Sequence, residues 1–170
     1  MTGKQKGLLV LAVIALLIAI PLIYYYVLPM FDTSPEEQIR RIVELGAESA
    51  ESGDADYIAG ILSDNYAGPL FDSKAELVSN LRRGLKEMED LQIDIIAIVV
   101  DVAEHGRSAE VECEFYPTGF YTGSSMYNRV PMRGLRNQGP NDPDVLWLDF
   151  VKEADEQWRV IGGNIQDVTF

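Results

Sequence analysis

Hydrophobic residues fill the N-terminal part of the chain before any periodic pattern begins. The stretch 7–31 contains 25 residues and no charged side chain. About 20 apolar residues, at a rise of about 1.5 Å each, cross the hydrocarbon core of a bilayer as a helix. The pattern therefore predicts a transmembrane helix over 7–31. Residues 1–6 form a short tail before it, and residues 32–170 form a separate domain.

The charges that flank this stretch predict its orientation. Lys4 and Lys6 precede it, whereas the first residue after it is the acidic Asp32. Positive charges favour the cytoplasmic side, so we expect a single-pass membrane protein with its N-terminus in the cytoplasm and its C-terminal domain outside. The competing interpretation is a cleaved signal peptide. Cleavage requires small residues after the apolar run, but residues 24–30 are bulky, which favours an uncleaved anchor.

Beyond the apolar stretch, hydrophobic residues recur at helical spacing in three segments. The first follows Ser34 and ends near Gly53, and its apolar face consists of Ile39, Ile42, Val43, Gly46, Ala47 and Ala50. The second is short and begins at Asp54 or Asp56. The third begins with a capping box at Ser73 and is expected to end near Asp90.

The hydrophobic period then changes from helical spacing to alternation. Residues 91–102 predict a strand in which the phase slips at Ile95 and Ile96, which indicates either a β-bulge or a strand buried on both faces. Residues 109–115, 145–152 and 158–161 predict further strands, and the long segment 121–143 predicts a loop. We expect Gly162 and Gly163 to interrupt the last strand. Helices followed by antiparallel strands are typical of an α+β domain.

Charge and composition narrow the classes of partner. Residues 32–170 contain all 27 acidic residues and 12 of the 14 basic ones, so their net charge is 12 − 27 = −15. Such a surface repels phosphate backbones, which argues against nucleic acid as a partner. The single cysteine, Cys113, excludes an internal disulfide, and the chain contains no metal-ligand cluster or cofactor-binding motif. We therefore expect no metal and no cofactor.

Two segments resemble proteins of the nuclear transport factor 2-like superfamily, which includes the SnoaL-like and ketosteroid-isomerase-like proteins. One is the helix pair around ESGDADYIAGILSDNYAG, and the other is the terminal hairpin LWLDFVKEADEQWRVIGGNIQDV. The resemblance covers about residues 34–168. It implies three N-terminal helices packed in a strongly curved antiparallel sheet, which forms a cone with a pocket at its open end.

The resemblance does not carry over the catalytic residues of that superfamily. Its catalytic members place a carboxylate base after the second helix, but here residues 67–71 contain no acid before Asp72. The remaining candidates for a pocket carboxylate are Asp101 and Asp149, because an acid buried without a partner has a raised pKa and can act as a base.

The aromatic residues are the stronger indication of a site. We expect four of them to line an apolar ligand pocket in the cone: Tyr57, Tyr66, Phe115 and Trp147. The alternative is that these aromatic residues belong to the ordinary core of the domain.

The predicted loop differs in charge from the rest of the domain. Residues 121–141 contain Arg129, Arg133 and Arg136 and no acid. Arginine among apolar neighbours suits the capture of a carboxylate-bearing partner or of lipid headgroups. The alternative is that these arginines contact the acidic body of their own domain.

Together these patterns favour a membrane-tethered, extracytoplasmic binding or assembly module that is not an enzyme. The layout resembles the extracytoplasmic subunits of bacterial secretion systems that carry this fold behind one helix. The partner would be a protein or a second copy of the chain. The alternative is a small-molecule enzyme of the isomerase, cyclase or dehydratase type that uses Asp101 or Asp149. The direction in which those carboxylates point distinguishes the two.

Overall fold

The computed structural model describes residues 34–69, 71–122, 130–135 and 142–165. From Pro35 onward, these residues belong to one compact unit. The predicted tail 1–6 and the predicted membrane stretch 7–31 lie outside the described residues. Within the described part of the chain, no helix is both long and apolar enough to cross a bilayer.

Three helices form the first half of the described domain. Helix α2 spans Pro35–Ser52, α3 spans Ala55–Ile61 and α4 spans Lys74–Lys86. Asp54 caps α3 by accepting hydrogen bonds from two backbone N–H groups, and the Ser73 hydroxyl caps α4 by accepting one from the Glu76 N–H. Within the described domain, the three predicted helices and their order are confirmed.

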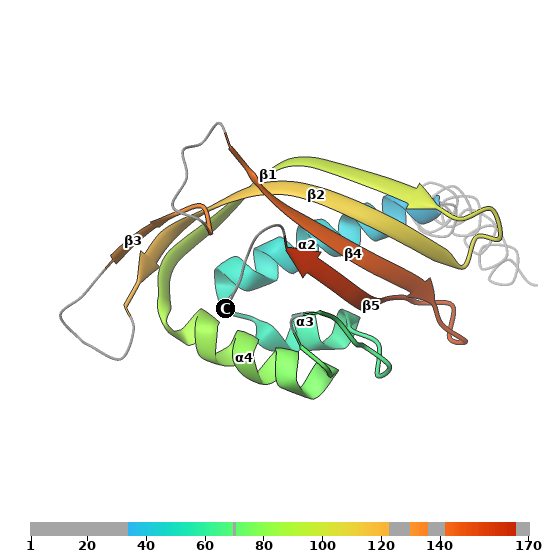
Figure 1. Cartoon of the computed structure of the whole chain (residues 1–170), viewed down its shortest axis with the longest axis horizontal. Coiled ribbons are helices and arrows are strands. Elements are labelled where there is room, and N and C mark those ends of the chain that lie inside the picture. Colours follow the sequence, from blue (N-terminus) through green and yellow to red (C-terminus); the bar gives the residue numbers. More distant parts are fainter. Residues whose placement is uncertain (1–33, 70, 123–129, 136–141, 166–170) are drawn as a thin grey trace, which may run out of the picture. The chain divides into compact units, whose positions relative to one another are not determined.

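A curved antiparallel sheet forms the second half. Its strands are β1 (Met88–Val102), β2 (Ser108–Tyr121), β3 (Val130–Arg133), β4 (Asp144–Lys152) and β5 (Trp158–Ile165). The strand order is β1-β2-β4-β5, and β3 pairs with β2. Figure 1 shows the sheet arching over the three helices. The α+β class and the curved sheet are as the sequence predicts.

Several sequence predictions are wrong. Strand β2 runs to Tyr121 rather than ending near residue 115. Helix α4 ends at Lys86 rather than near Asp90, because Met88 already pairs with Tyr121 in the sheet. The segment predicted as a continuous loop contains β3, whose pairing with β2 no local pattern reveals. Gly162 and Gly163 do not interrupt the last strand, since both pair with β4.

The predicted bulge in β1 is confirmed. Ile95 lies opposite Phe115 and Ala97 lies opposite Glu114, which leaves Ile96 as the extra residue. Ile93 and Ile95 before the bulge and Ile98 after it therefore all face the helices, although the sequence changes phase between them.

Candidate functional site: an apolar cavity inside the cone

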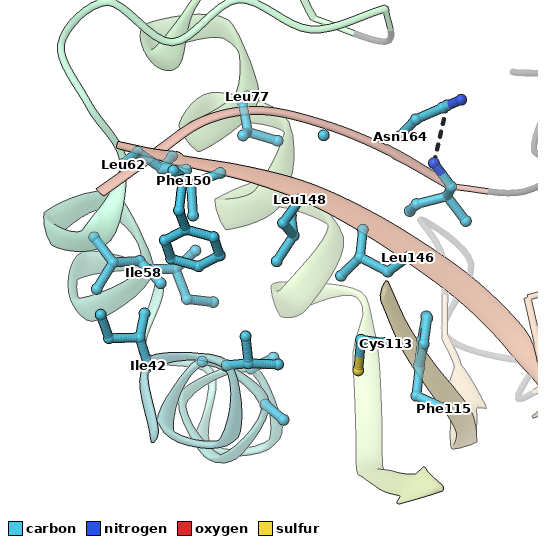
Figure 2. A pocket seen from close by; sticks show the side chains of 18 of the residues that line it. Ile42, Ile58, Leu62, Leu77, Cys113, Phe115, Leu146, Leu148, Phe150 and Asn164 are labelled. Carbon is cyan, nitrogen blue, oxygen red and sulfur yellow. Dashed lines mark hydrogen bonds between the residues drawn. The ribbon is translucent and has the colours of Figure 1, made fainter. Parts of the chain in front are cut away.

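A cavity of about 280 Å³ lies between the concave face of the sheet and the helices. Figure 2 shows Leu146, Leu148 and Phe150 along β4, with Ile42 of α2 and Ile58 of α3 across from the Phe150 ring. The described lining is Ile42, Val43, Gly46, Ala47, Ala50, Ile58, Ile61, Leu62, Tyr66, Phe71, Leu77, Ile93, Ile95, Cys113, Phe115, Leu146, Leu148, Phe150, Val160, Gly163, Asn164 and Ile165.

Small residues on α2 account for part of the open space. The first turns of this helix present Ile39 and Val43, which are buried in the core. Later turns present Gly46, Ala47 and Ala50 to the cavity. The residues share one face because their spacing is three or four. The same helix therefore fills the core at its beginning and leaves room at its end.

Side chains of β2 and β4 form the wall of the cavity opposite the helices, because every second side chain of a strand points to the same face. Leu146, Leu148 and Phe150 are two residues apart on β4, so their side chains share one face of the sheet. Cys113 and Phe115 do the same on β2. Each strand thus contributes an apolar row to the cavity.

Hydrogen bonds hold the bend after α3 against β5 and so position Tyr66. The Ser63 N–H donates to the Val160 carbonyl at 2.9 Å, and the Ala67 N–H donates to the Ile161 carbonyl at 3.0 Å. The Ser63 hydroxyl is fully buried and donates to a Glu153 carboxylate oxygen at 2.6 Å. This anchoring holds the bend in place, so that the buried Tyr66 side chain lines the cavity.

The ionisable groups of the described lining are held in their neutral forms. Burial raises the pKa of the Cys113 thiol to about 11, with a smaller contribution from the charge of Glu114. Burial also raises the pKa of the Tyr66 phenol above its ordinary value. No Asp, Glu, His, Lys or Arg is among the described residues that line the cavity. At neutral pH the described wall therefore carries no charge.

Two of the four aromatic residues expected to line the pocket do so. Tyr66 and Phe115 line the cavity, but Tyr57 and Trp147 do not. Trp147 is 38% exposed, and its indole N–H donates to a Glu112 carboxylate oxygen at 3.1 Å. It lies on the opposite face of the sheet because it alternates with the inward Leu146 and Leu148.

Neither candidate carboxylate lines the cavity. Asp101 and Asp149 are exposed, and each lies opposite Glu110 in the sheet. Asp149 alternates with the inward Leu148 and Phe150, which places it on the outer face. The structure therefore places both acids away from the apolar pocket.

The predicted arginine loop is described only in part. Arg133 is exposed and belongs to β3. Arg129 and Arg136 lie outside the described residues, so the binding surface formed by the three arginines stays a prediction. Among the described residues, no group of three or more His, Cys, Asp or Glu side chains is arranged to hold a metal ion.

Sequence reasoning missed most of the residues that define the cavity. The sequence identifies Gly46, Ala47 and Ala50 only as part of an apolar helix face, and it places Cys113 only within the predicted strand 109–115. Their small size was the available signal, because a run of small residues on an otherwise bulky face leaves unfilled volume.

Comparison with known proteins supports the fold. No protein-family model matches the sequence, and no curated protein matches it. Several solved structures are similar in fold at low sequence identity. A candidate dehydratase of the nuclear transport factor 2-like family from Streptomyces avermitilis has a TM-score of 0.61 and 14% identity, over 80% of this chain and 97% of the other.

Two further solved structures share this fold. A candidate aromatic ring hydroxylase from Novosphingobium aromaticivorans has a TM-score of 0.60 and 10% identity, over 79% of this chain and 90% of that protein. A nuclear transport factor 2-like protein of unknown function in nutrient uptake from Rhodospirillum rubrum has a TM-score of 0.57 and 15% identity, over 77% and 98%. The domain therefore has the nuclear transport factor 2-like fold.

Proposed function

We propose that this chain is a membrane-tethered binding module that holds an uncharged, apolar ligand in its cone and does not transform it. The observation that supports this most directly is the chemistry of the cavity wall. The described lining is almost entirely aliphatic and aromatic, and its two ionisable groups, Tyr66 and Cys113, are neutral at pH 7. A charged ligand that entered a cavity with such a wall would lose its hydration without gaining a charged partner.

General acid–base catalysis requires a group that can exchange a proton near the working pH and lies within reach of the substrate. Raised pKa values move the Cys113 thiol and the Tyr66 phenol away from that range. Some structural neighbours are candidate enzymes, but a shared fold does not fix function. The geometry therefore favours binding over turnover.

The size of the cavity limits the ligand. An apolar cavity of about 150 Å³ accommodates benzene. The present cavity, at about 280 Å³, is roughly twice as large. It suits a bicyclic hydrocarbon or a short aliphatic chain.

The tether forms the second part of the proposal. The uncharged stretch 7–31 anchors the chain as a single transmembrane helix, with residues 1–6 in the cytoplasm and the domain outside. Arg129, Arg133 and Arg136 form a contact surface for a protein partner. An apolar ligand partitions into the bilayer, so tethering keeps the cone close to the ligand's reservoir.

The single cysteine provides a direct test of cavity occupancy. Full-length protein in zwitterionic lipid nanodiscs is treated at about pH 9 with N-ethylmaleimide, and modification of Cys113 is followed by intact mass. Naphthalene, as the apolar probe, should slow this modification several-fold because Cys113 lines the cavity. Naphthalene-2-sulfonate should leave the rate unchanged, because its charge opposes entry.

Two variants, each with one alanine replaced by phenylalanine, test whether naphthalene acts in the cavity or through the bilayer. Ala47→Phe fills part of the cavity that Cys113 also lines, so naphthalene should have little further effect on the modification of Cys113. Ala154→Phe makes the same change at an exposed turn and should behave as the unmodified chain does. The proposal fails if naphthalene never protects the thiol, or if the sulfonate protects it equally well.

A further inference from the structure

The face of the sheet that points away from the cavity combines apolar and acidic side chains. The pairing of β1 with β2 and of β2 with β4 arranges side chains on this face in three rows that run across the strands. Each row contains one residue from β1, one from β2 and one from β4. The rows are Ala97–Glu114–Val145, Val99–Glu112–Trp147 and Asp101–Glu110–Asp149. We call these nine residues the outer face.

The middle row is open to solvent. Val99 is 61% exposed and Trp147 is 38% exposed, so they are two of the large apolar side chains that the domain leaves uncovered. They flank Glu112, which accepts the hydrogen bond from the Trp147 indole. Exposed apolar side chains gathered on one face are characteristic of interaction sites.

The charges of this face all have one sign. The outer face carries five carboxylates and no basic side chain. Strands β1 and β2 contain no Lys or Arg at all, and β4 contains only Lys152 at its end. A surface of this kind is complementary to a basic partner and repels an acidic one.

The third row concentrates that charge. Glu110 lies directly opposite Asp101 on one side and Asp149 on the other, and like charges in opposed positions destabilise a sheet. The three acids line a depression of about 450 Å³ with Gly162, where an added Cβ would lie 2.9 Å from an Asp149 carboxylate oxygen. A cation seated there would relieve the repulsion.

The separation of these carboxylates favours an organic cation over a metal ion. Among the described residues, these three carboxylates included, no group of three or more His, Cys, Asp or Glu side chains could hold a metal ion. Guanidinium and ammonium groups on flexible side chains can instead reach carboxylates that are spread over neighbouring strands.

We propose that the outer face docks a basic segment of a protein partner. Lysine or arginine side chains of the partner pair with the five carboxylates, and its apolar side chains cover Val99 and Trp147. A second copy of the domain is a poor occupant for face-to-face packing, since it would set five carboxylates against five. This surface is separate from the cavity, so the docking does not depend on the ligand.

A peptide of ten alternating arginine and valine residues provides the probe. Its affinity for the full-length protein in zwitterionic nanodiscs is measured by fluorescence anisotropy, with empty nanodiscs as the blank. A peptide with citrulline in place of arginine has nearly the same shape without the charge, and it should bind at least about ten-fold more weakly. Binding should also weaken as salt is added, because exposed charges are screened.

Two triple variants separate the outer face from the charge of the whole domain. Glu110→Gln, Glu112→Gln and Asp149→Asn together should weaken arginine-peptide binding by about ten-fold, as expected for three exposed ion pairs. Glu44→Gln, Glu48→Gln and Glu104→Gln remove the same charge at exposed positions elsewhere and should have little effect. Trp147→Ala should weaken binding without any change in charge, and circular dichroism verifies that each variant is folded.

Three results would overturn the proposal. Equal losses in the two triple variants would show attraction to net charge alone. Equal binding of the citrulline peptide would show that the cations are not recognised. If light scattering shows a dimer that Trp147→Ala dissociates, the face is an interface between copies of this chain instead.

Discussion

At the scale of single residues, the two tryptophans show how strand position decides the environment of the same side chain. Trp158 begins β5 and is only 4% exposed, whereas Trp147 in the middle of β4 is 38% exposed. Trp158 belongs to the core cluster with Phe150 and Val160. Its indole N–H has no hydrogen-bond partner among the described residues. The stabilisation by Trp158 therefore comes from apolar packing.

Truncation of Trp158 should be costly for that reason. Trp158→Ala should lower the free energy of unfolding by about 3–5 kcal/mol, as loss of a buried aromatic side chain does. Trp158→Phe should cost much less, because it retains a ring and removes the unsatisfied N–H. Urea denaturation followed by circular dichroism measures both.

The exposed tryptophan provides the control for this comparison. Trp147→Ala should change stability by about 1 kcal/mol or less, since a half-exposed side chain loses little burial. Equal costs at the two positions would mean that Trp158 does not pack in the core.

At the scale of elements, the glycine pair in β5 is a requirement of close strand packing. A Cβ on Gly162 would lie 2.9 Å from an Asp149 carboxylate oxygen and 3.2 Å from the Ala67 carbonyl oxygen. A Cβ on Gly163 would lie 3.0 Å from the Trp147 carbonyl oxygen. The glycines thus let β5 lie against β4 and the bend after α3, instead of ending the strand.

Gly162→Ala should therefore destabilise the domain by about 1–3 kcal/mol, the usual cost of overpacking. Gly60→Ala is the matched control, because a Cβ there meets nothing within 4 Å and Gly60 lies inside helix α3. That change should be neutral, or should stabilise by about 0.5–1 kcal/mol through the better helix propensity of alanine. Thermal denaturation measures both variants. If Gly162→Ala and Gly60→Ala change the stability equally, the structure relieves the crowding at Gly162 without cost.

At the scale of the whole molecule, the feature that bears on membrane orientation is the uneven distribution of charge along the chain. Residues 1–31 carry two lysines and no acid, and the remainder carries a net charge of −15. Such a division suits a chain whose basic end remains in the cytoplasm.

The corresponding prediction concerns topology. Protease added to intact spheroplasts should degrade the domain and leave a short, membrane-embedded N-terminal fragment detectable by mass spectrometry. If the domain is protected until the spheroplasts are lysed, the predicted orientation is wrong and the domain lies in the cytoplasm. A mature chain that begins after residue 31 would identify the apolar stretch as a signal peptide.

Much of the architecture could be predicted because helix and strand patterns are local. Periodicity of three to four residues marked α2, α3 and α4, and alternation marked β1, β2 and β4. The bulge at Ile96 could also be predicted, since a change of hydrophobic phase is visible in one strand alone. Strand β3 could not, because its four residues gain their partner only through pairing with β2.

The sequence by itself determined the order of the three helices and of strands β1, β2, β4 and β5, the acidic composition of the domain and the absence of an acid from residues 67–71, because each depends on neighbouring residues or on composition. Only the tertiary structure decided which residues share the cavity. The register of distant strands turns Phe115 inward and Trp147 and Asp149 outward. That register depends on contacts between strands far apart in the chain, and a shift of one residue would exchange the two faces.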